Sequence, residues 1–484
     1  MSVAELSRSR RMLVLAICCM SLLIVGLDVT VVNVALPSIQ HDLHASVSGL
    51  QWIISAYALV LASLLMLSGS TADRVGRRRT FQVGLAMFTL GSLLCSLAPS
   101  LPLLVVFRMV QAVGGSMLNP VAMSIITNVF TDRTERAQAI GVWGAVIGLS
   151  MALGPVVGGV LVSSVGWRSI FWVNIPVGVA AIVLTALFVP ESKAARPRKP
   201  DPVGQVLVIV SLAALVYAII EGPNRGWTSP EILALFAVAA IAAVGFAGYE
   251  KRHREPLLDL RFFGSAPFTG ATVIAVLAFA CLGGFLLLNT LYLQDVRGYS
   301  AVHAGLFMLP MAVMTVLFSP ISGRIVGTRG SRLPLAAAGI AITVSALTLT
   351  RLGTGTSALS LVVSYLLFGL GFGLVNAPIT NTAVSGMPVA QAGVAAAVAS
   401  TSRQVGQSVG VAVIGSVVVS VMVGPLRTGF VTASHVGWWL IAGCGVAVLV
   451  VGLITAGAWG RRTAERVAME FQTAAEVAPA PVAR

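Results

Sequence analysis

The sequence predicts an all-α membrane protein that crosses the bilayer fourteen times and leaves no room for a soluble domain. Of its 484 residues, 57% are hydrophobic and 10% are charged, and the mean hydropathy is +0.93. Soluble domains carry about 25% charged residues, so this composition excludes one. A transmembrane helix needs about 20 consecutive apolar residues. Stretches of that kind lie near residues 12–35, 50–71, 80–98, 102–124, 137–161, 170–189, 203–221, 232–249, 268–292, 304–326, 333–350, 357–378, 397–421 and 434–458.

The basic residues support this layout, because they gather at alternate ends of the predicted helices. With the N-terminus in the cytoplasm, about 24 of the 31 Lys and Arg residues fall on the cytoplasmic side and about five fall outside. Short cytoplasmic loops of membrane proteins carry such an excess. An even number of spans with both termini inside follows, and a twelve-span layout of the same parity stays open. The net charge of +14 then indicates orientation and contact with anionic lipid rather than with nucleic acid.

The order of spans and loops divides the chain into two bundles around an inserted pair. The predicted segments are a cytoplasmic N-terminus at 1–11, a six-helix bundle at 12–189, a basic linker at 190–202, an inserted helix pair at 203–249, a cytoplasmic loop at 250–267, a second six-helix bundle at 268–458 and a cytoplasmic tail at 459–484. The tail is polar and rich in Ala and Pro from about Glu465, so we expect disorder there. GSTADRVGRRR after the second span has a weak echo, SGRIVGTRGSR, after the tenth, and such repeats indicate two related halves.

Asp28, in the first-span stretch LDVTVVNVALP, is the carboxylate that lies most clearly inside an apolar run. A charge there costs at least about 3 kcal/mol on insertion scales, so such an acid is normally paired or protonated and marks a proton or ion pathway. Arg108 in the fourth span lies at a similar depth, roughly 9 Å below the outer end against roughly 12 Å for Asp28. Burial favours the neutral acid and a nearby Arg favours the charged acid. The sequence therefore predicts a proton-coupling pair, with a static ion pair as the alternative.

Two further stretches carry a distinct pattern of glycines and charges. GSTADRVGRRR, between the second and third spans, sets an acid among arginines, where Asp73 can pair with Arg77 or cap a helix N-terminus. Its residues of interest are Gly69, Asp73, Arg74, Gly76 and Arg77. GLSMALGPVVGG, in the fifth span, combines a helix-kinking proline with small residues that permit close helix packing. Its residues of interest are Gly148, Gly154, Pro155, Gly158 and Gly159. A basic membrane anchor and ordinary small-residue packing are the respective alternatives.

Together with LVVFRMVQAVGG around Arg108 and WRSIFWVNIPVG entering the sixth span, these stretches resemble the major facilitator superfamily, specifically its fourteen-span drug:proton antiporters of the QacA/EmrB type. The resemblance runs over nearly the whole chain. It implies the major facilitator fold, with two six-helix bundles plus two inserted helices. It also implies that the Asp73 loop locks one conformational state, and that the Pro155 stretch is the antiporter motif typical of exporters.

The resemblance further implies proton-coupled efflux of small amphipathic drugs or antibiotics by alternating access, with Asp28 carrying the proton and Arg108 modulating it. The substrate cavity should lie between the halves near the bilayer midplane. Candidate lining residues are Asn33, Tyr57, Asn119, Asn289 and Asn376. Arg403 in the thirteenth span either snorkels toward the cytoplasmic end or lies deeper and is functional.

Spans nine to fourteen contain no deep acid, whereas relatives that export divalent cations tend to have one there, so we expect neutral or monocationic substrates. No P-loop, metal-site or catalytic motif occurs, so the sequence predicts no enzyme and no cofactor other than the coupling proton. A monomer in the bacterial cytoplasmic membrane is expected. A dedicated exporter of one antibiotic, metabolite or lipid is the main alternative. A sensor without transport and a uniporter are the others, and a uniporter would not respond to a pH gradient.

Overall fold

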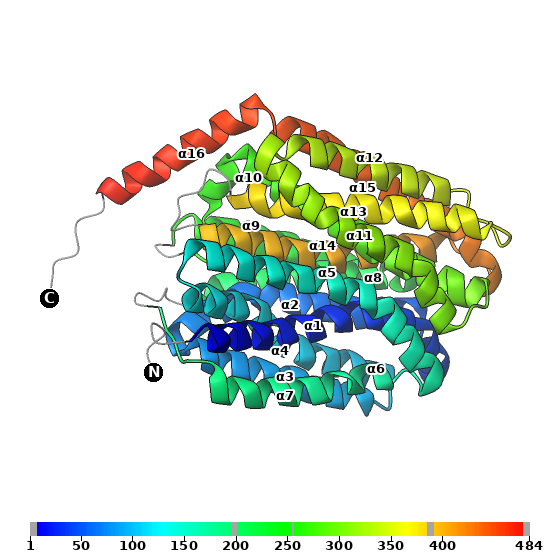
Figure 1. Ribbon diagram of the computed structural model, residues 1–484. Helices are drawn as coiled ribbons and strands as arrows, with labels where there is room; N and C mark the ends of the chain where they lie inside the picture. The colour runs from blue at the N-terminus through cyan, green and yellow to red at the C-terminus, as the bar shows by residue number, and fades with distance from the viewer. Residues whose placement is uncertain (1–6, 195–200, 254–255, 385–391, 478–484) are drawn as a thin grey trace.

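The protein is a bundle of long helices that run side by side along one axis (Figure 1). A computed structural model describes residues 7–194, 201–253, 256–384 and 392–477, and these residues form helices and loops without a strand. The start of α1 (Arg8–Leu43) and the end of α15 (Leu426–Thr455) lie at the same end of the bundle. We call this the basic end, because Arg8, Arg77 and Arg133 begin helices there, and we call the other the opposite end.

Two helical bundles and an inserted pair make up the chain. The first bundle contains α1, α2 (Val47–Val75), α3 (Arg77–Ser96), α4 (Leu101–Val129), α5 (Arg133–Ser164), α6 (Ser169–Trp172) and α7 (Asn174–Phe188). The inserted pair is α8 (Pro202–Arg225) and α9 (Pro230–Glu250), and η2 (Leu260–Gly264) follows it. The second bundle contains α10 (Ala266–Leu291) with η3 (Tyr292–Val296), α11 (Ala301–Arg329), α12 (Arg332–Leu349), α13 (Ala358–Val384), α14 (Ala392–Val421) and α15. The last helix is α16 (Ala458–Val477).

Twelve helical segments of the described chain are long and apolar enough to cross a membrane. The predicted third and fifth spans are not among them. The third, α3, begins with three arginines that lower its hydropathy, and the apolar stretch found in α5 covers only Leu153–Ser164. Both helices still pack lengthwise, α3 on α4 and α7, and α5 on α1 and α11. The all-helical membrane architecture is therefore confirmed for the described residues, and the count of fourteen spans stays a prediction.

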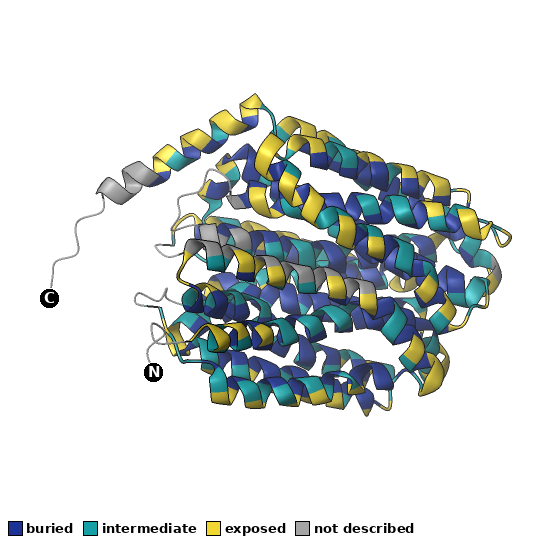
Figure 2. Ribbon diagram, viewed as in Figure 1, coloured by how far each residue is buried: buried dark blue, intermediate teal, exposed yellow. Residues whose placement is uncertain are grey.

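Apolar side chains cover the outer sides of the bundles as well as their cores. Along α11 and α12, exposed residues follow the outer helix faces (Figure 2), and many of them are large and hydrophobic, Leu317 and Ile340 being examples. A soluble protein rarely exposes such a continuous apolar surface. Hydrocarbon tails of lipid are the environment that this surface fits.

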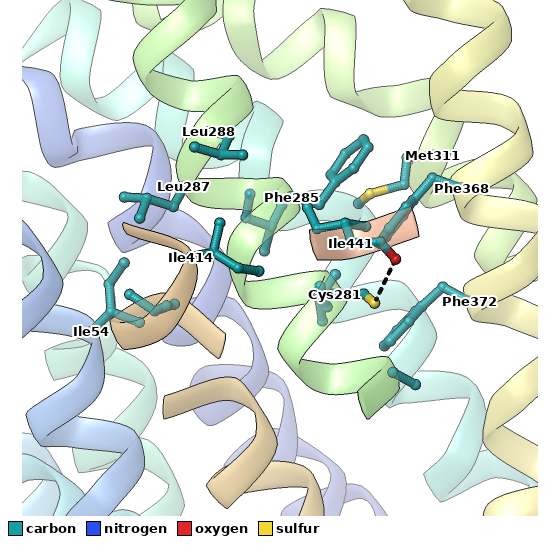
Figure 3. Packing of buried hydrophobic residues seen from close by; sticks show 14 of the residues in the cluster. Ile54, Cys281, Phe285, Leu287, Leu288, Met311, Phe368, Phe372, Ile414 and Ile441 are labelled. Atoms are coloured by element: carbon teal, nitrogen blue, oxygen red, sulfur yellow. Dashed lines mark hydrogen bonds between the residues drawn. The ribbon is translucent and has the colours of Figure 1, made fainter. Parts of the chain in front are cut away.

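The core of the second bundle is built on aromatic rings. Phe285 of α10 stacks on Phe368 of α13, with ring centroids 3.9 Å apart and an interplanar angle of 20°. Trp438 of α15 meets the same ring edge-on at 5.8 Å. Figure 3 shows Phe285 among Met311, Ile414 and other buried side chains contributed by several helices. This packing ties α10, α13 and α15 into one unit.

The inserted pair is held against the first bundle. Three side chains of α8 take part in hydrogen bonds to α2, near both ends of α8. These bonds are Trp52 Nε1 to Glu221 Oε1 at 2.8 Å, Asn224 Nδ2 to Ser48 Oγ at 3.0 Å and Gln205 Nε2 to the Ser63 carbonyl at 2.5 Å. On α14, by contrast, α8 packs through apolar side chains, Val216 and Ile220 lying in one cluster with Ala412. The polar anchorage of the pair is therefore to α2.

The helix α16 corrects an expectation drawn from composition. We expected disorder from about Glu465, but the chain is helical up to Val477. Ala464, Val467 and Phe471 form one buried stripe, and the Phe471 ring lies 5.3 Å from Phe262 of η2. The spacing of three and four residues is that of an amphipathic helix. Our expectation of disorder gave more weight to the polar composition of the tail than to this spacing.

We expect Phe285→Ala to destabilise the protein by about 3–5 kcal/mol, because it leaves a cavity where three aromatic contacts were. The measurement is the apparent melting temperature of the purified protein in detergent. Leu90→Ala is the control, since Leu90 is 52% exposed on the outer face of α3 and its truncation leaves no internal cavity. Equal melting temperatures for the two variants would show that the aromatic cluster does not hold the second bundle together.

Candidate functional site

A fully buried ion pair joins α1 to α4. The Nη1 atom of Arg108 lies 2.5 Å from Oδ2 of Asp28, and each residue is 2% exposed. Two more donors reach the same carboxylate on its other oxygen, Gln111 Nε2 at 2.9 Å and Asn174 Nδ2 at 3.1 Å. Because all three groups donate, Asp28 has the surroundings of an ionised carboxylate, which only accepts.

Amide side chains extend this pair into a network of four helices. Gln111 also accepts from Arg108 at 2.6 Å, and it donates to the hydroxyl of Ser92 at 2.7 Å. Asn174 donates to the same hydroxyl at 3.3 Å. Helices α1, α3, α4 and α7 therefore meet at one polar centre inside an apolar bundle. Sequence reasoning missed Gln111 and Ser92, although Gln111 follows Arg108 by three residues and so shares its helix face.

The polar centre borders the contact between the two bundles. The guanidinium carbon of Arg108 lies 4.0 Å from the centroid of the Tyr57 ring in α2, and the buried Tyr57 hydroxyl has no hydrogen-bond partner among the described residues. Beside these two side chains is a small cavity, whose lining includes Gln404 and Gln407 of α14. Since Arg108 itself lines this cavity, the ion pair borders a space shared by both bundles.

The four asparagines proposed as cavity lining occupy different surroundings. Asn33 is buried and donates to the Val29 carbonyl at 2.8 Å, and Asn376 donates to the Phe372 carbonyl at 3.0 Å. Asn289 is fully buried inside the second bundle, where Tyr365 donates to it at 2.7 Å, so it lies away from the cavity. Asn119 of α4 has a buried amide oxygen without a partner in the described part of the chain.

The glycines of the fifth-span motif place α5 against both bundles at once. A Cβ added at Gly154 would overlap Thr30 of α1, and one added at Gly158 would lie 3.1 Å from Val31. On its other side, a Cβ at Gly159 would lie 2.6 Å from the Ala301 carbonyl of α11. Gly148 belongs to the same helix, but its surroundings are outside the described part. The motif therefore brings α1, three residues beyond Asp28, close to the second bundle.

Pro155 takes part in the same contact from the other direction. Gly305 of α11 packs so closely on the Pro155 carbonyl that an added Cβ would overlap it. The α5–α11 contact is therefore backbone against backbone, near the opposite end of both helices.

Hydrogen bonds close the same end of the bundle interface. Ser55 of α2 and Ser408 of α14 each donate to the carbonyl of the other, at 3.2 and 3.1 Å. Gln51 accepts from Ser416 at 3.3 Å, one helical turn or more further along. In the described residues, the hydrogen bonds between α2 and α14 therefore run from mid-bundle to the opposite end. This conformation is closed at the opposite end.

The loop between α2 and α3 is folded onto the segment that follows α7. Asp73 Oδ1 accepts from Arg77 Nη2 at 3.0 Å, and the Asp73 carbonyl accepts from Ala194 at 3.1 Å. Gly76 has φ +129°, a conformation that favours glycine, and Arg74 is exposed. Gly69 faces Pro120 of α4, 3.9 Å from an added Cβ.

Glu191 is a second acid in this loop region that sequence reasoning missed. Its carboxylate accepts from the backbone N–H groups of Arg78 and Arg79 at 3.1 and 3.3 Å. N–H groups in the first turn of a helix have no acceptor within the helix, and a negative charge there is stabilising. Since the acid lies more than a hundred residues away, spacing along the chain could not reveal it.

Arg403 lies in α14, between α13 and α10. Its Nη2 atom donates to Thr380 Oγ1 at 2.5 Å and to the Asn376 carbonyl at 3.4 Å. The guanidinium carbon lies 5.8 Å from the Phe279 ring. No described carboxylate lies within ion-pair distance of it. Neither the Asp28 network nor the α5 contact includes this residue.

Two helical bundles that meet beside a buried ion pair of the first bundle define a membrane transporter built from two related halves. The family model of the Major Facilitator Superfamily matches residues 18–411, most of the chain. The chain therefore belongs to the major facilitator superfamily, as its motifs predicted.

Curated relatives include drug-resistance proteins. The chain is 38% identical over 398 residues to the multidrug resistance protein Stp of Mycobacterium tuberculosis, which covers 82% of this chain and 74% of that protein. It is 38% identical over 403 residues to the tetracenomycin C resistance and export protein of Streptomyces glaucescens, with the same coverages. A methylenomycin A resistance protein of Bacillus subtilis is 31% identical over 453 residues, 93% of each chain.

Among solved structures, the fold is similar to that of a bacterial homologue of the human drug peptide transporters PepT1 and PepT2. The TM-score is 0.62, the identity is 14%, and the match covers 96% of this chain and 99% of that one. At this identity the likeness concerns the fold alone.

Removing one member of the buried pair should destabilise the protein more than removing both charges. Asp28→Asn leaves the Arg108 cation without its counter-charge, at a cost of about 3–5 kcal/mol. The double variant Asp28→Asn/Arg108→Gln has no buried charge and should recover much of the loss. Apparent melting temperatures in detergent test this order. A single Asp28→Asn variant as stable as the unmodified protein would mean that the pair is not formed.

A larger side chain at Gly305 should prevent closure at the opposite end. In a background without the five native cysteines, we expect Gly305→Val to speed maleimide labelling of a cysteine placed at the buried position 51 in detergent-purified protein. Gly323→Val is the matched control in the same helix, because a Cβ at Gly323 meets nothing within 4 Å. If both variants label at the unmodified rate, the α5–α11 contact does not control this end.

Proposed function

We propose that this protein exports small amphipathic drugs or antibiotics in exchange for protons by alternating access. The observation that carries the proposal is the buried Asp28–Arg108 pair with its amide donors, placed beside the interface of the two bundles. An intramembrane acid that is buried, paired and next to a moving contact is suited to carry a coupling proton. The names of the curated relatives, resistance and export proteins, support the direction of transport.

Protonation of Asp28 would change more than one contact. The neutral acid loses its charge attraction to Arg108, and one oxygen becomes a donor in a site that already holds three donors. Arg108 then needs another acceptor, and the cavity beside Tyr57 lies next to it. A substrate group or water in that cavity can supply one. Protonation of Asp28 would thereby free the guanidinium, and loss of the proton would return it to the carboxylate.

The proposed cycle moves the two bundles about their α5–α11 and α2–α14 contacts. If the basic end is cytoplasmic, as the positive-inside pattern indicates, the described conformation is closed toward the outside. Export would require the glycine contacts around Gly159 and Gly305 to separate. The Asp73 loop, now bonded to Arg77 and Ala194 within its own bundle, would then be free to lock the outward-open state.

The finer features of the proposal follow the sequence. We propose fourteen spans, with α3 and α5 crossing beside the twelve apolar segments, in a monomer of the bacterial cytoplasmic membrane with both termini inside. The substrates are expected to be neutral or monocationic, because no acid comparable to Asp28 is buried at mid-depth in the described residues of α10 to α15. Anionic lipid contacts the basic loops. Protons are the coupling ion, and no other cofactor is needed.

A dedicated exporter of one compound is the second candidate. It is favoured by relatives whose names refer to a single antibiotic, such as tetracenomycin C or methylenomycin A. The same fold and the same proton site would serve both functions. Breadth of specificity, rather than mechanism, separates the two.

Ethidium efflux under an imposed pH gradient tests the coupling. In proteoliposomes, the unmodified protein should move ethidium only while the gradient lasts and should stop when an uncoupler is added. Asp28→Asn should reduce gradient-driven transport by at least tenfold, because the variant has no group at this position that can carry a proton. Fluorescence of the dye bound to internal DNA reports the rate.

The outcomes separate the candidates. Gradient-driven transport by Asp28→Asn would exclude Asp28 as the proton carrier. Transport by the unmodified protein that ignores the gradient would indicate a uniporter. Absence of ethidium transport, with gradient-driven transport of one compound from a panel of antibiotics, would favour the dedicated exporter.

A further inference from the structure

Arg403 is a membrane-embedded cation that has no counter-charge among the described residues, and the proposed mechanism does not use it. Its guanidinium is bonded to a hydroxyl and a backbone carbonyl, which are both neutral. The contrast is Arg108, whose charge is matched by Asp28. A charged side chain at membrane depth is costly unless it is paired or serves a pathway. Since the described residues offer no pair, a ligand charge is the remaining way to compensate it.

The guanidinium has donors to spare. Of its three nitrogens, Nη2 makes both of the described hydrogen bonds, and Nε is buried without a partner in the described residues. The planar fork of an arginine matches a carboxylate, which can accept two parallel hydrogen bonds.

The surroundings of Arg403 suit an aromatic acid. Thr380, which accepts from Arg403, is exposed, as is its neighbour Asn381, and polar side chains of this kind fit a water-filled space rather than lipid. Phe279 lies on the other side of the guanidinium and stacks edge-on against Phe372, with centroids 5.1 Å apart. Acid recognition and an aromatic wall therefore occur together at this position.

The residue that follows Arg403 borders the cavity beside the proposed proton site. The next residue, Gln404, lines the cavity beside Arg108 and Tyr57, and its buried Oε1 has no partner among the described residues. By helix rise, Arg403 lies roughly 16 Å from the start of α14, well inside the helix. Gln404 follows Arg403 directly in α14, so the two polar side chains lie at about the same depth in the bundle.

We propose that Arg403 is the binding site for an acidic group of the substrate, a carboxylate or an ionised phenol on an amphipathic aromatic compound. The inference rests on the proposed export function and specifies its cargo. Among the neutral substrates, those that bind at Arg403 would be zwitterions, whose acidic group is balanced by a cation. Compounds without an acidic group, such as ethidium, do not depend on Arg403.

A matched pair of ligands tests the site directly. Norfloxacin is an aromatic zwitterion with a carboxylate, and its ethyl ester lacks that charge. We expect the unmodified protein to bind norfloxacin at least about tenfold more tightly than the ester, the range of a charge-assisted hydrogen bond. Arg403→Gln should remove this preference while leaving ester binding unchanged. Quenching of tryptophan fluorescence in detergent measures binding without requiring transport.

Three controls keep the test specific. Arg351→Gln removes a positive charge from an exposed loop and should keep the full preference. Arg403→Lys keeps the charge without the fork and should keep part of it. Ethidium transport under a pH gradient should be the same in Arg351→Gln as in the unmodified protein.

Several results would overturn the inference. They are no preference for norfloxacin in the unmodified protein, an unchanged preference in Arg403→Gln, and equal losses for norfloxacin and the ester, which would indicate a structural role. Failure of all gradient-driven transport would refute the proposed function instead. The binding preference and its response to Arg403→Gln would still decide the assignment of the acid site.

Discussion

The constraint on which the first bundle depends is that a charge buried in an apolar interior must be neutralised and its hydrogen bonds satisfied. Asp28 meets this requirement with donors from α4 and α7, and Ser92 of α3 completes the shell. Four helices are thereby fixed relative to one another at mid-depth. Any change in the charge of Asp28 would therefore alter contacts in all four helices.

Close backbone packing conveys that change to the second bundle. The residues directly after Asp28 on α1, Thr30 and Val31, fill the spaces left by Gly154 and Gly158 of α5. On the next face of α5, Gly159 lies against α11. Such contacts tolerate little deformation, because packed interiors adopt discrete arrangements. A shift of α1 would therefore reach α11 through the close packing of α5.

The sequence predicted the parts of the fold and site that depend on local pattern. Apolar runs and arginine placement indicated the helical membrane architecture, and depth along each helix put Asp28 near Arg108. The sequence did not predict contacts between residues far apart along the chain. Examples are the bond from the start of α3 to Glu191 and the bond from Asn174 to Asp28. At α16 the polar composition predicted disorder wrongly. The segment is helical, and three apolar residues at helical spacing are buried.

The anchorage of α8 bears on how such a chain can acquire extra helices. A helix wedged between two moving halves would obstruct them if it were bonded to both. Here the described hydrogen bonds join α8 to α2, while α8 contacts α14 through apolar side chains. The pair would therefore move with the first bundle and slide along α14 through an apolar contact. An insertion of this kind adds length to the protein, while its described hydrogen bonds join it to the first bundle.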